Sequence, residues 1–438
     1  MTTTEAIQKS PLTAGKSTFL KHYGPTVVGQ CVLLVVGILT GVLAARILGP
    51  VGRGEYAAIT IWPLAIVGVL ALGINQAIAF TLGRRLFTVS EVATAVTTIG
   101  FVQCCLSIMI GLVVIHFVLA TYSRATQHLG LIFVLSTPAL ILSGNPANIF
   151  QGLQHRLRFN LIRVIAASTY CVGLLGLYRT HRGGLTSVIL FLTLGYVVAF
   201  MVGSAMVWHI LRPRWQWNSS AIRRLIHFGS RAQATNLTSY FNQRVDQLLL
   251  SLFVPPKDLG LYVVAVTLST TVSVFPQAAG IVTFARGSSL QSDDARATIG
   301  YSFRASLIWL LLCCSVLYWL CPFLIRRAFG SAFEGSILPC RILLPGALMT
   351  GLNQVLYNGA SALGRPGLPS CAEGVCMTVT AAGLYLLVPR YGYLGAAVVS
   401  SVAYTLSFML MLGLAQKQLS LSLWDLLIEG HTPAKREP

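Results

Sequence analysis

Long apolar runs separated by short polar turns fill most of the 438-residue sequence. The first two runs set the pattern, because residues 25–48 carry a single charge, Arg46, and residues 57–83 carry none. At a rise of about 1.5 Å per residue, each run is long enough to cross about 30 Å of hydrocarbon as an α-helix. The turn between them holds residues that favour chain reversal: Gly49, Pro50, Gly52 and Gly54.

The same pattern continues along the chain and predicts an all-α, polytopic membrane protein. We expect twelve transmembrane helices: 25–48, 57–83, 92–120, 128–151, 160–178, 185–211, 226–254, 260–285, 301–325, 335–361, 368–388 and 393–415. A polar cytoplasmic linker, 212–225, divides them into two six-helix bundles, 25–211 and 226–415. Residues 1–24 and 416–438 are expected to be cytoplasmic tails. Because all connections are short, no soluble domain is expected.

An internal repeat relates the two bundles. Pro50, Gly54 and Tyr56 recur 206 residues later as Pro256, Gly260 and Tyr262. Pro138, Gly144 and Gly152 recur 207 residues later as Pro345, Gly351 and Gly359. Such a duplication predicts pseudo-equivalent halves, and in membrane transporters the substrate path lies between the two halves.

Composition and charge support a membrane setting. The sequence is 55% hydrophobic and 10% charged, against about 25% charged in soluble domains. The net charge of +19 therefore describes loops and not a nucleic-acid surface. With the N-terminus inside, 19 of the 31 Lys and Arg residues fall on inside segments and nine on outside segments, which predicts that both termini are cytoplasmic. The ten cysteines have no metal-site spacing and are expected to pack as small hydrophobic residues.

Three segments resemble the polysaccharide-transporter branch of the multidrug/oligosaccharidyl-lipid/polysaccharide (MOP) exporter superfamily, and most of all its O-antigen and exopolysaccharide flippases: ARILGPVGRGEYAAI, NQRVDQLLLSLFVPPKDLGLYVVAV and RILLPGALMTGLNQVLYNGASALGRPG. The resemblance spans about residues 24–414. It implies a fold like that of multidrug (MATE) exporters, with two bundles in a V around a central cavity. It also implies flipping of an undecaprenyl-diphosphate-linked oligosaccharide to the outer leaflet of the inner membrane. The expected partners are a polysaccharide polymerase and export machinery. The related peptidoglycan-precursor flippases usually have two further spans.

The seventh span is the most polar and is the first candidate for the substrate path. On a continuous helix, one face would hold four polar residues: Asn236, Ser239, Gln243 and Asp246. One interpretation makes this face a cavity wall on which Arg231 or Arg244 binds phosphate through its planar fork. The other makes Asp246 and Arg244 packing partners of neighbouring helices, since Arg244 lies about 200° from Asp246 on such a helix.

Other candidates lie at span ends and deep within spans. Arg85 and Arg286 close spans two and eight, where they either anchor to anionic lipid or capture the diphosphate. Asn75 and Asn353 lie mid-span and either bond across helices or bind sugar hydroxyls. Glu373 is expected to cap a helix or face a loop, with a proton or sodium site as the alternative.

The sequence also weighs against rival functions. A cation-coupled drug exporter would need a buried acidic site, but spans one to six contain only Glu55 and Glu91, both at span edges. A glycan polymerase or ligase would need a large catalytic outer loop, so we expect a transporter and not an enzyme. No Gly-rich phosphate loop is present, so no cofactor is expected. A proton gradient, a sodium gradient and the membrane potential all stay open as the energy source.

Overall fold

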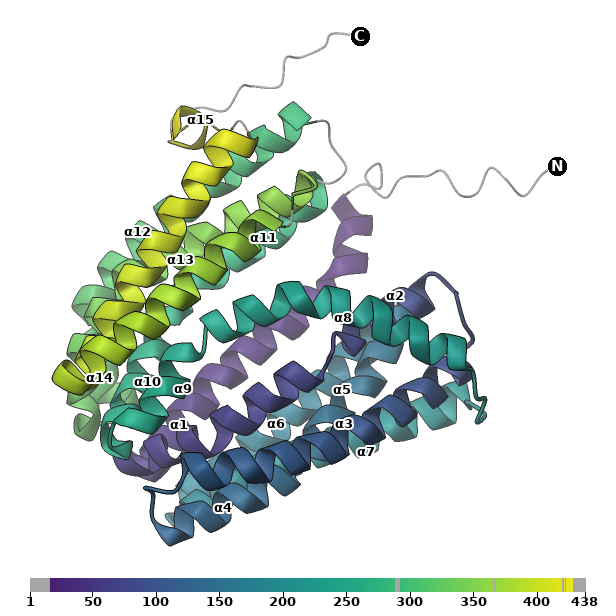
Figure 1. Ribbon diagram of the computed structural model, residues 1–438, viewed down its shortest axis with the longest axis horizontal. Helices are drawn as coiled ribbons and strands as arrows, with labels where there is room; N and C mark the ends of the chain where they lie inside the picture. Colours follow the sequence, from purple (N-terminus) through teal and green to yellow (C-terminus); the bar gives the residue numbers. More distant parts are fainter. Residues whose placement is uncertain (1–15, 288–291, 366, 420, 422, 428–438) are drawn as a thin grey trace. The chain divides into compact units, whose positions relative to one another are not determined.

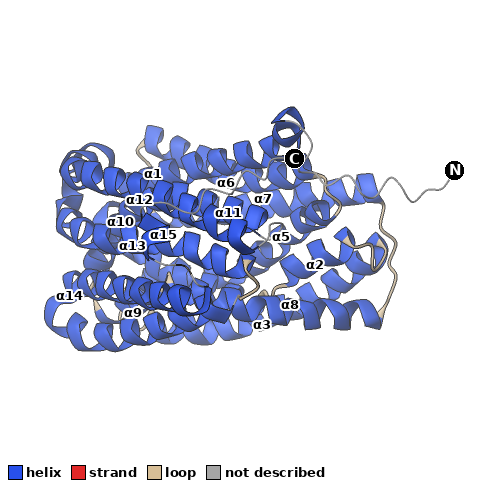
Figure 2. Ribbon diagram, turned by 90° about the horizontal axis from the view of Figure 1, so that it is seen from above, coloured by secondary structure: helices blue, strands red, loops and turns tan. Residues whose placement is uncertain are grey.

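The computed structural model describes residues 16–287, 292–365, 367–419, 421 and 423–427. Throughout these residues the secondary structure is helical, with the helices joined by short turns (Figure 2). The predicted all-α class is therefore confirmed. Nine helical segments of the described chain are long and apolar enough to cross a membrane.

The first half contains seven helices (Figure 1): α1 (Lys16–Leu70), α2 (Ile74–Gly83), α3 (Val89–Val118), α4 (Arg124–Leu135), α5 (Thr137–Gly152), α6 (Arg156–Thr180) and α7 (Leu185–Leu211). The second half contains α8 (Ser219–Asn242), α9 (Val245–Phe253), α10 (Pro256–Thr270), η2 (Thr271–Ser273), α11 (Val274–Gly287), α12 (Ser292–Leu324), η3 (Ile325–Phe329), η4 (Ser331–Ser336), α13 (Ile337–Ala362), α14 (Gly367–Leu419) and α15 (Leu423–Leu427).

Every one of the twelve predicted spans falls on helix, but helices and spans do not correspond one to one. Two turns between spans are so tight that the two helices on either side of each follow one another directly, within the ranges of α1 and α14. α1 reverses at Gly49 (φ 65°) and α14 at Gly392 (φ 56°), where only glycine adopts such angles without strain. The charged residues of the predicted N-terminal tail up to Lys9 lie outside the described residues, whereas Lys16 already begins α1.

Three predicted spans that we expected to be continuous are broken, and a fourth tightens locally into the 3-10 turn η2. The breaks fall at Ala71–Gly73, at Ser136 and at Gln243–Arg244. Leu72 (φ 45°) and Gly73 (φ 61°) take left-handed backbone angles that end α1, and Pro138 opens a new helix, α5, within the fourth span. Hydrophobic periodicity does not detect such breaks because the residues on both sides remain apolar.

The chain forms two compact units, each with its own core. Unit 1 comprises Met1–Thr40, Leu70–Ile108 and Leu135–Ala232, within the described range. Its core gathers residues of α2, α3, α5, α6, α7 and α8. These unit boundaries cut through α1, α3 and α8, so the predicted bundles 25–211 and 226–415 remain a prediction.

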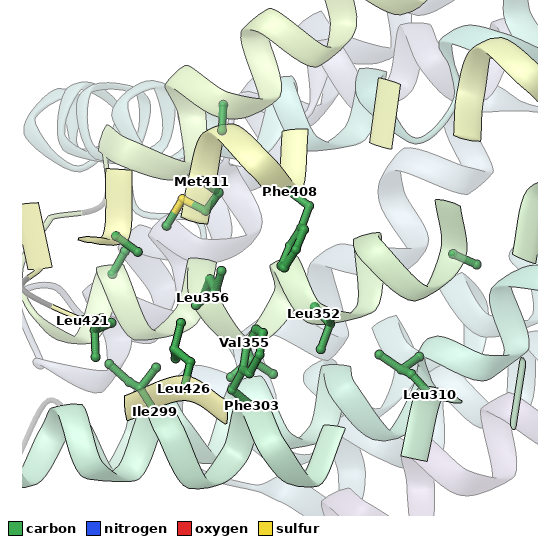
Figure 3. Packing of buried hydrophobic residues seen from close by; sticks show 14 of the residues in the cluster. Ile299, Phe303, Leu310, Leu352, Val355, Leu356, Phe408, Met411, Leu421 and Leu426 are labelled. Carbon is green, nitrogen blue, oxygen red and sulfur yellow. The ribbon is translucent and has the colours of Figure 1, made fainter. Parts of the chain in front are cut away.

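Unit 2 comprises Gly41–Val69, Met109–Val134 and Gln233–Pro438, within the described range. Figure 3 shows its core, where Phe303 of α12, Val355 of α13 and Phe408 of α14 lie together. The rings of Phe303 and Phe408 stack with centroids 6.4 Å apart. Unit 2 therefore contains the turn of the first repeat as well as most of the second half.

Candidate functional site

The break in the second span is stabilised by two glutamine side chains. Gln233 donates a hydrogen bond from Nε2 to the carbonyl oxygen of Gly68 (2.6 Å), and Gln103 donates from Nε2 to the carbonyl oxygen of Leu70 (2.6 Å). Both carbonyls lack their usual helical partner because the helix ends at Leu70. An unpaired carbonyl in hydrocarbon costs several kcal/mol. The two amides therefore make the break a stable structural feature.

Polar side chains follow this break directly. Asn75 and Gln76 are exposed at the start of α2. Asn148 of α5 donates from Nδ2 to Asn75 Oδ1 (2.8 Å) and to the carbonyl oxygen of Gly144 (2.7 Å). Of the two predicted roles of Asn75, the bond across helices is therefore present. The exposed amide edge of Asn75 and Gln76 can also donate and accept hydrogen bonds with a polar ligand.

Helix α8 packs very closely on this region of unit 1. A Cβ added to Gly73 would lie well within 3.0 Å of the Gly229 carbonyl, and one added to Gly229 would meet the Leu72 carbonyl just as closely. The rings of Phe80 of α2 and Phe228 of α8 also stack, with centroids 4.1 Å apart. The guanidinium of Arg84 lies 4.9 Å from the Phe80 ring centroid. The contact therefore requires glycine on both sides.

The four candidate arginines occupy different settings. Arg85 is exposed just beyond α2, with φ 53°. Arg231 is exposed on α8, and Arg244 is exposed in the turn between α8 and α9. Arg286 lies in α11, but its side chain is outside the described part of the structure. Three guanidinium groups are thus accessible to a ligand or to lipid headgroups.

The predicted polar face of span seven is not continuous. The helix breaks at Gln243–Arg244, so the spacing argument that placed Gln243 and Asp246 on one face is wrong. Gln243 is exposed, whereas Asp246 is only 2% exposed in α9. Asn236 and Ser239 lie on the α8 backbone, and their side chains are outside the described residues.

Asp246 belongs to a buried hydrogen-bond network in unit 2. Tyr262 donates from its hydroxyl to Asp246 Oδ2 (2.6 Å), and the backbone N–H of Gln247 donates to Oδ1 (2.7 Å). The Tyr262 hydroxyl also lies 3.2 Å from Ser400 Oγ. The network ties α9 to α10 and to α14, which agrees with the packing interpretation of Asp246.

A second buried polar cluster lies between α13 and α14. Asn353 donates from Nδ2 to Ser407 Oγ (3.3 Å), and the Tyr357 hydroxyl lies 3.0 Å from the same oxygen. Glu373 is 5% exposed and interacts electrostatically with Tyr357 and with Cys376. The expectation that Glu373 caps a helix or faces a loop is therefore wrong, because α14 begins at Gly367 and places it one turn and a half inside the packed helix.

The turns of the two repeats contact each other within unit 2. A Cβ on Gly54 would lie on the carbonyl of Pro256, and a Cβ on Gly260 would lie on the carbonyl of Pro50, both well within 3.0 Å. The contact is reciprocal and joins residues that the repeat had identified as equivalent.

Further hydrogen bonds surround this contact of the two turns. Arg46 donates to the carbonyl oxygens of Arg327 and Ala328, and Trp62 donates from Nε1 to Ser251 Oγ (2.9 Å). Tyr122 donates from its hydroxyl to the carbonyl oxygen of Ser251 (2.9 Å). Burial, aided by Glu55, raises the pKa of Tyr122 to about 12, so this hydroxyl stays a neutral donor.

Sequence reasoning missed three residues that make contacts in this region: Gln103, Asn148 and Gly229. Gln103 and Asn148 are amides within otherwise apolar runs, and that signal alone could have identified them. Gly229 carries no such signal because glycine is common in membrane helices.

Comparison with solved structures shows the fold. A structure of the lipid II flippase MurJ in an inward closed conformation has a TM-score of 0.74 and 15% sequence identity, covering 89% of this chain and 87% of that chain. An inward-facing multidrug resistance MATE transporter of the MOP superfamily also has a TM-score of 0.74, with 12% identity over 89% of this chain and 94% of that chain. A MOP superfamily transporter from Pyrococcus furiosus has a TM-score of 0.59 and 14% identity, with coverages of 92% and 95%.

Sequence comparisons add the family. No curated protein sequence matches the chain. A family model described as "Polysaccharide biosynthesis protein" matches residues 19–285, which is more than half of the chain. The chain is therefore a multi-pass membrane protein that belongs to the polysaccharide biosynthesis protein family, with the fold of the MurJ and MATE structures.

Proposed function

We propose that this protein flips an undecaprenyl-diphosphate-linked oligosaccharide from the cytoplasmic to the outer leaflet of the inner membrane by alternating access. The observation that carries the proposal is a polysaccharide-biosynthesis family match on a chain with a flippase and exporter fold. Both termini lie in the cytoplasm in this proposal, following the distribution of Lys and Arg. The flipped lipid would supply a polysaccharide polymerase and export machinery.

This orientation assigns the contact of the two turns to the outer side. The turns at Gly54 and Gly260 then form the outer closure, and the substrate enters from the cytoplasmic leaflet. The closure is made by backbone atoms on glycine, and the hydrogen bonds that Arg46, Trp62 and Tyr122 donate to the second half must break when it opens. Release requires that the two turns separate.

The headgroup path uses the exposed polar groups. A diphosphate carries about two negative charges, and each charge-assisted hydrogen bond contributes roughly 1.5–3 kcal/mol. Arg85, Arg231, Arg244 and Arg286 supply spread-out positive charge, so that binding stays weak enough for release. Asn75 and Gln76 offer amides to sugar hydroxyls. Asp246 has a packing role in this proposal, since Tyr262 and Gln247 already engage its carboxylate.

We assign energy coupling to the buried cluster around Glu373. A carboxylate in a membrane helix is expensive unless it binds a partner, a proton or a cation. Glu373 lies near Tyr357 and Cys376, on helices that also carry Asn353 and Ser407. Glu373→Gln should abolish the response of transport to an imposed proton or sodium gradient while the protein level stays normal. An unchanged response would remove Glu373 from the coupling mechanism.

The decisive test uses purified protein in vesicles that contain a fluorescent undecaprenyl-diphosphate oligosaccharide. We expect flipping that responds to an ion gradient or potential and that needs no ATP. Single Ala variants of Arg85, Arg231, Arg244 and Arg286 should slow flipping by about an order of magnitude, and Lys should restore only part of it because the fork is lost. Transport of cationic drugs without flipping of the lipid-linked glycan would contradict the proposal and favour the multidrug alternative.

A further inference from the structure

The linker between the two halves is held in place on unit 1. We define the linker strap as residues 212–218. The backbone N–H of Arg214 donates to Ser90 Oγ (3.1 Å), and that of Gln216 donates to Thr94 Oγ1 (2.9 Å). Asn218 then donates from Nδ2 to Glu91 Oε1 (2.6 Å). These bonds fasten alternate residues of an extended segment to the first turns of α3.

The side chains that this attachment leaves outside are cationic and aromatic. Arg212 and Arg214 are exposed, and Trp215 and Trp217 are 69% and 61% exposed. With the end of α7, the strap lines an open pocket of about 510 Å³, whose lining residues are Trp208, His209, Arg212, Pro213, Arg214 and Trp215. This volume lies within the range of small-molecule sites.

Glu91, the acidic residue that binds the strap, does not neutralise the positive charge of this pocket. Glu91 is not among the lining residues. Its carboxylate accepts hydrogen bonds from the Thr88 backbone N–H (2.8 Å), the Thr88 hydroxyl (2.9 Å) and Asn218. These bonds, the backbone bond of Thr88 first, hold the pKa of Glu91 below its usual value. The two guanidinium groups of the pocket thus face the outside with no carboxylate in the lining.

An apolar track leads along α7 to the pocket. Leu190, Leu194, Met201 and Trp208 are 43–66% exposed. At 100° per residue these four positions fall within about 40° of one another, so they form one stripe on α7. A stripe of this kind fits an acyl chain, and the pocket at its end fits a phosphate.

We propose that the strap pocket is a binding site for an anionic phospholipid of the bilayer. Arg212 and Arg214 donate paired hydrogen bonds to the lipid phosphate, as the guanidinium fork allows. Trp208 and Trp215 lie at headgroup level, where indole rings are favoured. One acyl chain follows the stripe on α7. This site is separate from the transport path and does not depend on the proposed substrate.

The test is native mass spectrometry of the full purified chain in detergent, with phosphatidylglycerol or phosphatidylcholine of identical acyl chains. The double variant Arg212→Ala/Arg214→Ala should lose about tenfold or more of the affinity for phosphatidylglycerol. The matched control Arg223→Ala/Arg224→Ala removes two exposed arginines just beyond the strap and should stay within about twofold of the parent protein. The variant Arg212→Lys/Arg214→Lys should show intermediate affinity, which separates loss of the fork from misfolding.

Three outcomes would overturn the proposal. One is equal loss of binding in the pocket variant and the control, which would indicate general charge attraction. Another is equal affinity for phosphatidylcholine and phosphatidylglycerol. A third is competition by free glycerol phosphate at concentrations that match the lipid, which would mean that the acyl track contributes nothing.

Discussion

Two reciprocal glycine contacts join the first and second halves of the sequence, and they differ in symmetry. In unit 2, a carbonyl of each turn packs directly on the glycine of the other turn. These glycines, Gly54 and Gly260, are equivalent positions of the repeat. In unit 1, Gly73 and Gly229 make the same kind of contact, but they are not repeat equivalents. The contact of Gly54 with Gly260 is therefore symmetric with respect to the repeat, whereas the contact of Gly73 with Gly229 is asymmetric.

The corresponding span of the second half does not reproduce the contact of Gly73. Gly280, 207 residues later, packs against Asn358 and Gln354 of α13, within its own half. A helix break with left-handed Leu72 follows α1, whereas η2 continues α10 into α11 with right-handed angles. The turns are thus alike in the two halves, while the interiors of the spans have diverged.

The largest effect is expected from breaking the symmetric contact. Gly54→Ala or Gly260→Ala places a methyl group on a backbone carbonyl, and overpacking of this kind costs about 1–3 kcal/mol. The turns cannot close, so we expect flipping to fall by about tenfold or more at normal membrane level. The measurement is surface glycan with protein quantified in the membrane.

Gly413→Ala is the matched control for this experiment, because a Cβ there meets nothing within 4 Å. We expect normal export from it. Normal export from Gly54→Ala and Gly260→Ala as well would mean that the turns do not need to meet.

The asymmetric contact should also be disturbed by a single methyl group, with an effect on stability. Gly229→Ala tests only whether there is room for a methyl group. A substitution of Gly73 would also strain the backbone, because Gly73 has a positive φ. We expect a loss of about 1–3 kcal/mol in the free energy of unfolding, measured by chemical denaturation in detergent. Gly176→Ala, on open space in α6, should change nothing. If Gly229→Ala were as stable as the control Gly176→Ala, α8 would not be held on α2 in this way.

Most of the helices follow from apolar run length, whereas the site does not. All twelve predicted spans are helical, because a long apolar run in lipid has few other ways to satisfy its backbone. The break at Ala71–Gly73 depends on Gln103, 30 residues away, and on Gln233, which lies in the other half of the sequence. Glu373 lies in a cluster with side chains of α13, which helical periodicity cannot reveal. The repeat identified Gly54 and Gly260 as equivalents but gave no sign that they touch.

A smaller effect is expected from releasing the break in span two. Gln103→Leu leaves the Leu70 carbonyl without its donor, and hydrogen bonds between membrane helices contribute about 0.6 kcal/mol on average. We expect a loss of stability of that order, with faster amide exchange confined to residues near Leu70. Gln151→Leu, at an exposed position of α5, is the control. Exchange that stays unchanged near Leu70 would contradict the stabilising role of Gln103.

The smallest effect concerns the strap that leads into α8. Because the pKa of Glu91 is lowered in the folded protein, its bonds to Thr88 and Asn218 stabilise the strap above the usual carboxyl pKa. That contribution is lost as the pH falls through the lowered pKa. Amide exchange of residues 212–218, corrected for intrinsic rates, should therefore increase in acid, and Glu91→Gln should remove this dependence. The same acid response in Glu91→Gln would assign it to another group.

Under the proposed function, the first and second halves separate around the contact of the two turns during each transport cycle. In unit 2 a Cβ on Gly41 would lie 3.8 Å from Thr267 Cγ2, so side chains at these two positions are in van der Waals contact and a pair of cysteines there can be tested for disulfide formation. The most direct measurement is flipping of the lipid-linked oligosaccharide by the variant Gly41→Cys/Thr267→Cys in vesicles, oxidised and then reduced, with each single variant as control. The account predicts that oxidation stops flipping in the double variant alone and that a reductant restores it. Undiminished flipping by protein shown to be cross-linked between these two positions would contradict the account.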